Sequence, residues 1–164
     1  MPKRVLNKGI RLSLMVVTLL VTSVTHAGAD VPQTPPIFGD ISIGKNFSPD
    51  PFTVRGMSGG SVPSNQVAKR TETATGPCTG FVDETPDHKL EITTKLDYLK
   101  LLVQSPEDTT LIVKGPGGTW CNDEFDGKNP GMVGEWLPGT YQIWVGSYVK
   151  GKYFPYTLQI SEVK

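Results

Sequence analysis

The sequence predicts an all-β protein, an antiparallel β-sandwich of jelly-roll type that follows a signal peptide and a proline-rich arm. Three observations carry this prediction. After residue 52, short apolar runs recur about every ten residues, a spacing typical of sandwiches. Turn residues separate these runs, and the 18 Gly and 14 Pro supply them. Beyond the N-terminal segment, no window of about ten residues shows the apolar stripe of a helix.

The first 29 residues predict a secretory signal peptide. Four basic residues lie between positions 3 and 11, an apolar run covers Leu12 to Val24, and Ala27 and Ala29 offer cleavage sites. The apolar run is shorter than the roughly 20 residues that a membrane span requires. We therefore expect an exported chain, periplasmic or extracellular, whose mature part has no membrane span.

The charge balance of the mature chain indicates which partners to exclude. The full sequence has 16 basic and 16 acidic residues, and four of the basic ones belong to the signal peptide. Removing them leaves 12 basic and 16 acidic groups, a net charge of −4. Because binding to nucleic acid needs a basic surface, we expect no nucleic-acid partner.

The rest of the chain divides into an arm and a sandwich. Residues 30–51 contain five prolines and predict a linker or extended arm, whereas residues 52–164 predict the sandwich. Leu90 and Ile92 alternate with polar residues, which indicates a strand. Apolar runs at Leu96–Val103 and Thr109–Gly115 predict two more strands, because turn signals follow each of them.

The last third of the sequence predicts two further strands, at Gly139–Tyr148 and Tyr153–Ile160. In the first of these, Tyr141, Ile143 and Val145 share one face, and Trp144 lies on the other. Since both faces carry large apolar groups, this strand is expected to be central.

The two cysteines, Cys78 and Cys121, both belong to the mature part of the chain. An exported chain meets an oxidising compartment, so we expect them to form a disulfide. A loop of this size gives a stabilisation of about 4 kcal/mol in the chain-entropy view.

The C-terminal half resembles the bacterial pre-peptidase C-terminal domain family. The similarity covers about residues 83–160, and its most specific parts are the motif Leu137-Pro138-Gly139-Thr140-Tyr141 and the motif Tyr156-Thr157-Leu158. The resemblance implies a β-sandwich on a secreted protein, acting as an accessory or binding module and not as a catalyst. In contrast to the usual arrangement in that family, we expect no catalytic domain beside the sandwich.

An acidic loop after the second cysteine is a candidate binding site for calcium. Carboxylate and amide oxygens are the ligands that Ca²⁺ prefers, and no imidazole lies in the loop. The acid that would complete an EF-hand is absent, so any site would be of a looser kind, and a solvated acidic turn is the alternative. The candidate ligands are Asn122, Asp123, Glu124, Asp126 and Asn129.

Aromatic residues concentrate in the same half of the chain. Trp120, Trp136 and Trp144 are candidate ligand-binding residues, because exposed rings stack on sugars or peptides. Filling of the core is the alternative for each of them. The expected partner is a protein or a carbohydrate of the envelope or medium.

These features predict an exported, monomeric, non-catalytic binding or accessory module. A small secreted hydrolase is one alternative, with Ser58 and His88 as a protease-like pair or Glu124 and Glu135 as glycosidase-like acids. A purely structural envelope protein is another.

Overall fold

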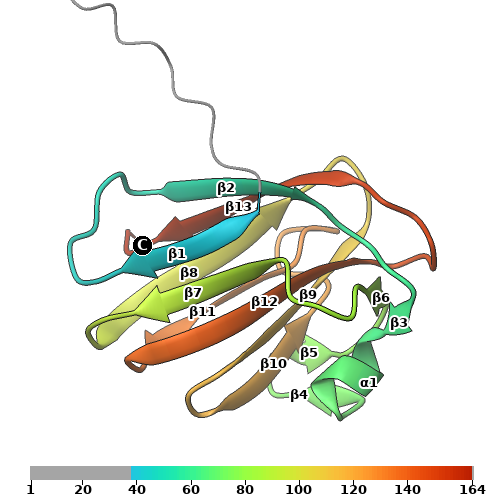
Figure 1. The fold of residues 1–164 in the computed structure, drawn as a ribbon, viewed down its shortest axis with the longest axis horizontal. Coiled ribbons are helices and arrows are strands. Elements are labelled where there is room, and N and C mark those ends of the chain that lie inside the picture. Colours follow the sequence, from blue (N-terminus) through green and yellow to red (C-terminus); the bar gives the residue numbers. More distant parts are fainter. Residues whose placement is uncertain (1–37, 164) are drawn as a thin grey trace, which may run out of the picture. The chain divides into compact units, whose positions relative to one another are not determined.

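The computed structural model describes residues 38–163, and its regular structure is almost entirely β-strand. Two main sheets stack face to face (Figure 1), which confirms the predicted β-sandwich. The larger sheet has seven strands, five of which run side by side. In spatial order these five are β1 (Gly39–Ile43), β7 (His88–Ile92), β12 (Gly139–Ser147), β9 (Thr109–Gly115) and β10 (Gly118–Asn122).

The second sheet has four strands, and every neighbouring pair in it is antiparallel. Its two edge strands are the first and the last of the spatial order. That order is β11 (Gly131–Trp136), β8 (Leu96–Gln104), β13 (Pro155–Ser161) and β2 (Phe52–Met57).

The main core lies between the two sheets. On β12, the predicted face of Tyr141, Ile143 and Val145 points into this core, and all three side chains are buried. Leu158 and Ile160 of β13 contribute from the opposite sheet. Alternation along each strand therefore builds the core as the sequence pattern predicts.

The first strand lies in the segment that the sequence assigned to a linker or arm. β1 pairs with β7 in parallel, so this one pair departs from the expected antiparallel arrangement. Ile41 and Ile43 are buried in the main core, which explains why the segment joins the sheet. The sandwich therefore begins before Phe52. The predicted signal peptide and residues 30–37 lie outside the described residues.

The chain between β2 and β7 folds against the outer face of the larger sheet, where Figure 1 shows α1, β4 and β5 next to β10. It builds a second apolar cluster on that face, so β9 and β12 are buried on both sides, as predicted for β12. The cluster contains Ala68, Cys78, Val82, Ile112, Cys121 and Trp144. The elements of this segment are β3 (Val62–Pro63), α1 (Ser64–Ala68), β4 (Glu72–Thr73), β5 (Gly76–Pro77) and β6 (Phe81–Val82).

Candidate ligand-binding site

A cleft of about 160 Å³ opens where β10 of the larger sheet and β11 of the second sheet face each other. Residues 132–137, from β11 and the residue after it, form one wall. Pro116 and Gly117, in the turn between β9 and β10, belong to the other wall, and Thr75 also lines the cleft. This volume is close to that of an apolar cavity that holds one benzene ring.

Three aromatic side chains line the cleft: Trp120 from β10, Trp136 from β11 and Tyr141 from β12. The ring centroids of Trp136 and Tyr141 are 4.9 Å apart, and each lies 6.5 Å from that of Trp120. Trp136 and Tyr141 are buried, whereas Trp120 is half-buried. The cleft therefore has a fixed aromatic lining with one partly accessible ring.

Hydrogen bonds hold the polar ends of two of these rings. The indole Nε1–H of Trp136 donates to the carbonyl of Leu99 at 3.1 Å. The Tyr141 hydroxyl donates to the carbonyl of Leu137 at 2.9 Å and accepts from its N–H at 3.1 Å. Burial raises the pKa of Tyr141, so this hydroxyl keeps its proton. Because both polar groups are satisfied within the protein, the rings offer the cleft apolar surface.

An exposed ion pair stands at the rim of the cleft. Lys95 Nζ lies 3.0 Å from a carboxylate oxygen of Glu135, which lines the cleft, and 3.3 Å from one of Asp97. The hydrogen bond to Glu135, followed by that to Asp97, raises the pKa of Lys95. Exposed pairs of this kind contribute little to stability. They give the rim a charged and polar character beside the aromatic lining.

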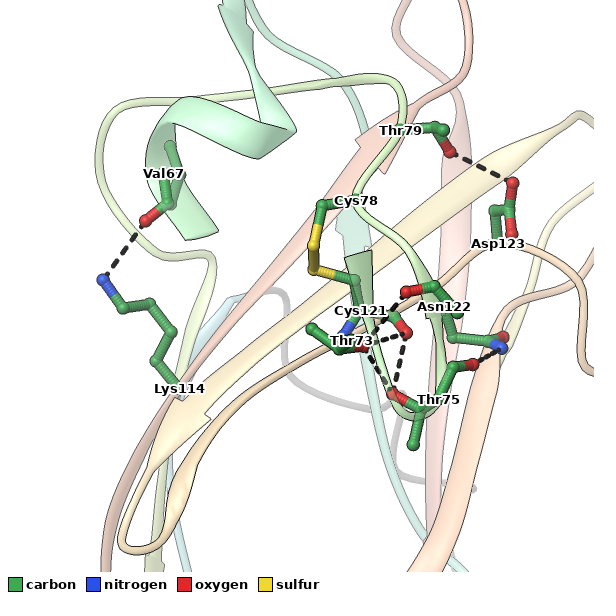
Figure 2. The surroundings of a disulfide bond; sticks show 10 residues. Val67, Thr73, Thr75, Cys78, Thr79, Lys114, Cys121, Asn122 and Asp123 are labelled. Carbon is green, nitrogen blue, oxygen red and sulfur yellow. Dashed lines mark hydrogen bonds between the residues drawn. A yellow bond between two sulfur atoms is a disulfide. The ribbon is translucent and has the colours of Figure 1, made fainter. Parts of the chain in front are cut away.

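The outer edge of β10, beside the cleft, is covered by a segment that carries two threonines and is tied to β10 by a disulfide (Figure 2). Cys78 and Cys121 are bonded, as predicted, and their Cα atoms lie 5.1 Å apart. The Thr73 hydroxyl accepts the N–H of Cys121 at 3.0 Å, and the Thr75 hydroxyl donates to its carbonyl at 2.8 Å. Side chains thus satisfy the backbone groups of Cys121 that face away from β9.

Asn122 joins this closed edge to the start of β11. Its amide nitrogen donates to the carbonyl of Thr75 at 2.9 Å (Figure 2). Its amide oxygen accepts the N–H of Gly131 at 2.9 Å. The side chain is buried. Asn122, one of the predicted calcium ligands, therefore serves as a structural bridge between the two walls of the cleft.

The other predicted calcium ligands follow in an exposed loop. Asn129 accepts the N–H of Ser105 with its side-chain oxygen at 3.1 Å, and Asp123 accepts the hydroxyl of Thr79 at 3.0 Å. Asp126 and Asn129 pair through their backbones, and Glu124 is exposed. Within residues 38–163, no three His, Cys, Asp or Glu side chains gather as a metal site would require. Calcium binding by this loop stays a prediction.

The structure brings together two of the three candidate tryptophans. Trp144 lies on the other face of the larger sheet, in the second apolar cluster. Its ring is covered by Lys114, whose Nζ lies 5.7 Å from the ring centroid and donates to the carbonyl of Val67. This position matches the packing alternative for Trp144. Sequence reasoning did not single out Tyr141 and Thr75 as cleft residues, because only the fold places them beside Trp120.

Ser58 and His88, the residues of the hydrolase alternative, have other partners. The Ser58 hydroxyl is fully buried and accepts the N–H of Phe154 at 3.3 Å. His88 Nε2 lies 2.7 Å from the hydroxyl of Tyr156. A nucleophilic serine needs access to substrate and a base within hydrogen-bond reach. The arrangement found here therefore gives no support to that alternative.

The two glycines after Ser58 have a packing role. Gly59 and Gly60 both have positive φ, and a Cβ on them would collide with backbone atoms of Lys152 and Val82 respectively. Only glycine permits such a close approach in this conformation. The glycine-rich motif is therefore explained by how the chain crosses the end of the sandwich.

Asp87, which is half-buried, and His88, which is buried, are neighbouring titratable residues at the start of β7. Burial raises the pKa of Asp87 to about 7, although its carboxylate accepts the N–H of Val145 at 2.7 Å. Burial lowers the pKa of His88 to about 4. The pKa values of the two side chains are therefore shifted in opposite directions from their ordinary values.

Sequence similarity to known proteins extends over part of this chain. No family model matches it. An uncharacterized protein of Synechococcus elongatus is 33% identical over 86 residues, which cover 50% of this chain and 63% of that relative. The chain thus matches less than two thirds of the relative's length.

Among solved structures, the chain is similar to the pre-peptidase C-terminal domain of a collagenase from Bacillus anthracis. The match covers 74% of this chain and 94% of that domain, with 12% identity and a TM-score of 0.43. Membership of that family stays a prediction at this level of similarity.

Proposed function

We propose that the chain is an exported, non-catalytic β-sandwich module that binds a ligand in the aromatic cleft between β10 and β11. The observation that carries this proposal is the cleft itself, in which Trp120, Trp136 and Tyr141 converge from three strands. Ligand sites are concave, are mostly apolar and have a few polar groups at the rim. The cleft combines an aromatic lining with the Lys95–Glu135 pair at its rim.

Two further observations support export. The cysteine pair is bonded, which suits an oxidising compartment. The basic and apolar N-terminal segment has the order of a secretory signal. Within residues 38–163, no helix has the length and apolar character needed to cross a membrane.

The three tryptophans allow a direct test of cleft binding. Each indole N–H gives its own signal in a ¹H–¹⁵N spectrum, and Trp144, on the far face of the sheet, serves as an internal control. The probes are millimolar N-acetyl-phenylalanine amide and methyl β-glucoside, because the cleft has room for one ring. The proposal predicts that at least one probe shifts the signals of Trp120 and Trp136 and leaves that of Trp144 in place. If neither probe moves the first two signals, the cleft is not a binding site.

A further inference from the structure

The direction of the backbone groups along β11 shows what kind of ligand its wall can accept. β11 is an edge strand, paired with β8 on one side. The carbonyl of Pro130 accepts the N–H of Val103, so Pro130 points toward β8. Backbone direction alternates along a strand, and therefore Met132 also points toward β8 while Gly131 and Val133 point away.

Within residues 38–163, the outward N–H of Gly131 has a partner, whereas the outward groups of Val133 have none. The N–H of Gly131 is already taken by the side chain of Asn122. No hydrogen bond to the outward N–H or C=O of Val133 is found among residues 38–163. Its side chain is 46% exposed, and a Cβ added at Gly134 would meet no atom within 4 Å. A short length of open strand edge therefore forms part of the cleft wall.

We propose that the occupant of the cleft is an extended peptide that pairs with β11 as an added strand and places one large apolar side chain against Trp120. This inference rests on the proposed function and names its ligand class. Adding a strand to a sheet edge gives affinity through main-chain hydrogen bonds, and a neighbouring hollow selects the side chain. Here Val133, the unpaired residue of the edge, also lines the ring-sized hollow.

The structure also limits the length of the added strand. The register between β11 and β8 shifts between Gly134 and Trp136, and such a bulge turns the strand edge away from regular pairing. Asn122 occupies the other end of the edge at Gly131. The peptide therefore pairs over only a few residues, and the anchoring side chain provides much of the specificity.

Two other occupants fit less well. The exposed residues of β11 are Val133, Gly134 and Glu135, so the same strand of a second copy has no large ring to fill the hollow. A sugar could stack on Trp120, but it does not offer the backbone N–H and C=O that pair with those of Val133 in a sheet. Both occupants become outcomes of the test.

The test uses the mature protein and two capped peptides of identical sequence, acetyl-Thr-Val-Phe-Val-Thr-amide and the same peptide with alternate backbone nitrogens methylated. The methylated peptide keeps the side chains but loses the ability to pair as a strand. We expect the plain peptide to shift the Trp120 and Trp136 signals and to bind at least about tenfold more tightly than the methylated one. Equal binding of the two peptides overturns strand addition but leaves the cleft as a binding site.

Variants of the protein give the complementary arm. Val133→Pro removes an N–H that the β8 ladder does not use, so we expect the fold to persist while affinity falls about tenfold or more. Val133→Thr keeps that N–H and should restore binding. Trp120→Ala should weaken binding to a similar degree, and Tyr148→Ala, at an exposed ring outside the cleft, should not.

Three results contradict the inference. The first is full peptide affinity in a folded Val133→Pro protein. If that variant does not fold, Trp120→Ala and the methylated peptide still decide the question. The second is a competition experiment in which cellotetraose displaces bound labelled peptide at a lower concentration than unlabelled peptide does. That result would point to a glycan as the ligand. The third is a dimer in sedimentation velocity that the peptide dissociates, which points to a second copy.

Discussion

The cleft is bounded by two edge strands, β10 and β11, whose outward backbone groups differ in their hydrogen bonding. On β10, the backbone groups of Cys121 are satisfied by Thr73 and Thr75, and the disulfide holds that segment in place. On β11, the outward groups of Val133 have no such partner among the described residues. Open edges invite pairing with other chains, so proteins usually cover them. The covered edge is thus a structural wall, and the open edge is the surface available to a ligand.

The largest expected effect on stability comes from removing the disulfide that ties the covering segment to β10. Replacing both cysteines, Cys78→Ser with Cys121→Ser, should lower the free energy of unfolding by about 4 kcal/mol, because the unfolded chain regains the entropy of a large loop. Urea unfolding of the mature protein and of the variant measures this loss. A loss below about 1 kcal/mol would mean that the threonine contacts and apolar packing hold the segment without the bond.

Asp87 and His88, which lie outside β10 and β11, make the stability of the fold depend on pH in opposite ways. In the folded protein the pKa of Asp87 is raised from 3.8 to about 7. Between these pH values the folded Asp87 binds more protons than the unfolded one, so its contribution to the free energy of unfolding falls as pH rises. Native His88, with its pKa lowered from 6.5 to about 4, binds fewer, so its contribution rises with pH. Between pH 4 and 6.5 the two slopes cancel.

Substitution should expose each slope. Relative to the parent, Asp87→Asn should gain about 3 kcal/mol of stability as pH rises from 4 to 6.5, because only the histidine slope remains. His88→Gln should show the opposite trend. Urea unfolding at a series of pH values measures both. Parallel curves for the parent and Asp87→Asn would show that Asp87 titrates alike in the folded and unfolded chains.

A smaller effect tests the threonine cover itself. Thr73→Val keeps the shape of the side chain but leaves the N–H of Cys121 without its acceptor. We expect a loss of about 1 to 2 kcal/mol in unfolding free energy. Thr140→Val, at an exposed position on β12, is the matched control and should change stability by less than about 0.5 kcal/mol. Similar losses in both variants would argue against a special role for Thr73.

The smallest effect concerns the predicted calcium site. The side chains of Asn122 and Asn129 and one carboxylate oxygen of Asp123 already have hydrogen-bond partners, so the other oxygen of Asp123, together with Glu124 and Asp126, would have to provide the ligands. At a calcium concentration a few times Kd, binding stabilises the fold by about 1 kcal/mol. We expect a slightly higher Tm in millimolar calcium than in EDTA, and no difference for Asp126→Asn. Coincident curves for the parent protein would leave the loop as an acidic turn.

The sequence predicted the strands that carry long apolar runs. The run Thr109–Gly115 has the bounds of β9, and the two faces of β12 followed from the alternation at Tyr141 to Val145. β1 escaped prediction because its pattern consists only of Ile41 and Ile43 within a proline-rich segment. The local sequence pattern was therefore sufficient to predict the strands that bury long apolar runs.

The cleft could be predicted only in part. Trp120 and Trp136 were recognised as candidates from their chemistry, but their meeting with Tyr141 depends on two sheets coming together at one side. The cover of β10 by Thr73 depends on a contact between residues 48 positions apart in the sequence. Such long-range hydrogen bonds have no signature in a single sequence.

Amide hydrogen exchange at two residues tests the difference between the edges most directly. In the free protein, the N–H of Cys121 is bonded to Thr73, whereas the N–H of Val133, a residue that lines the cleft, points away from β8. We predict that Val133 exchanges at least about a hundredfold faster than Cys121, because exchange at Cys121 requires the cover to open. Protection of Val133 equal to that of Cys121 in the free protein would contradict the account, since it would mean that the edge of β11 is already closed.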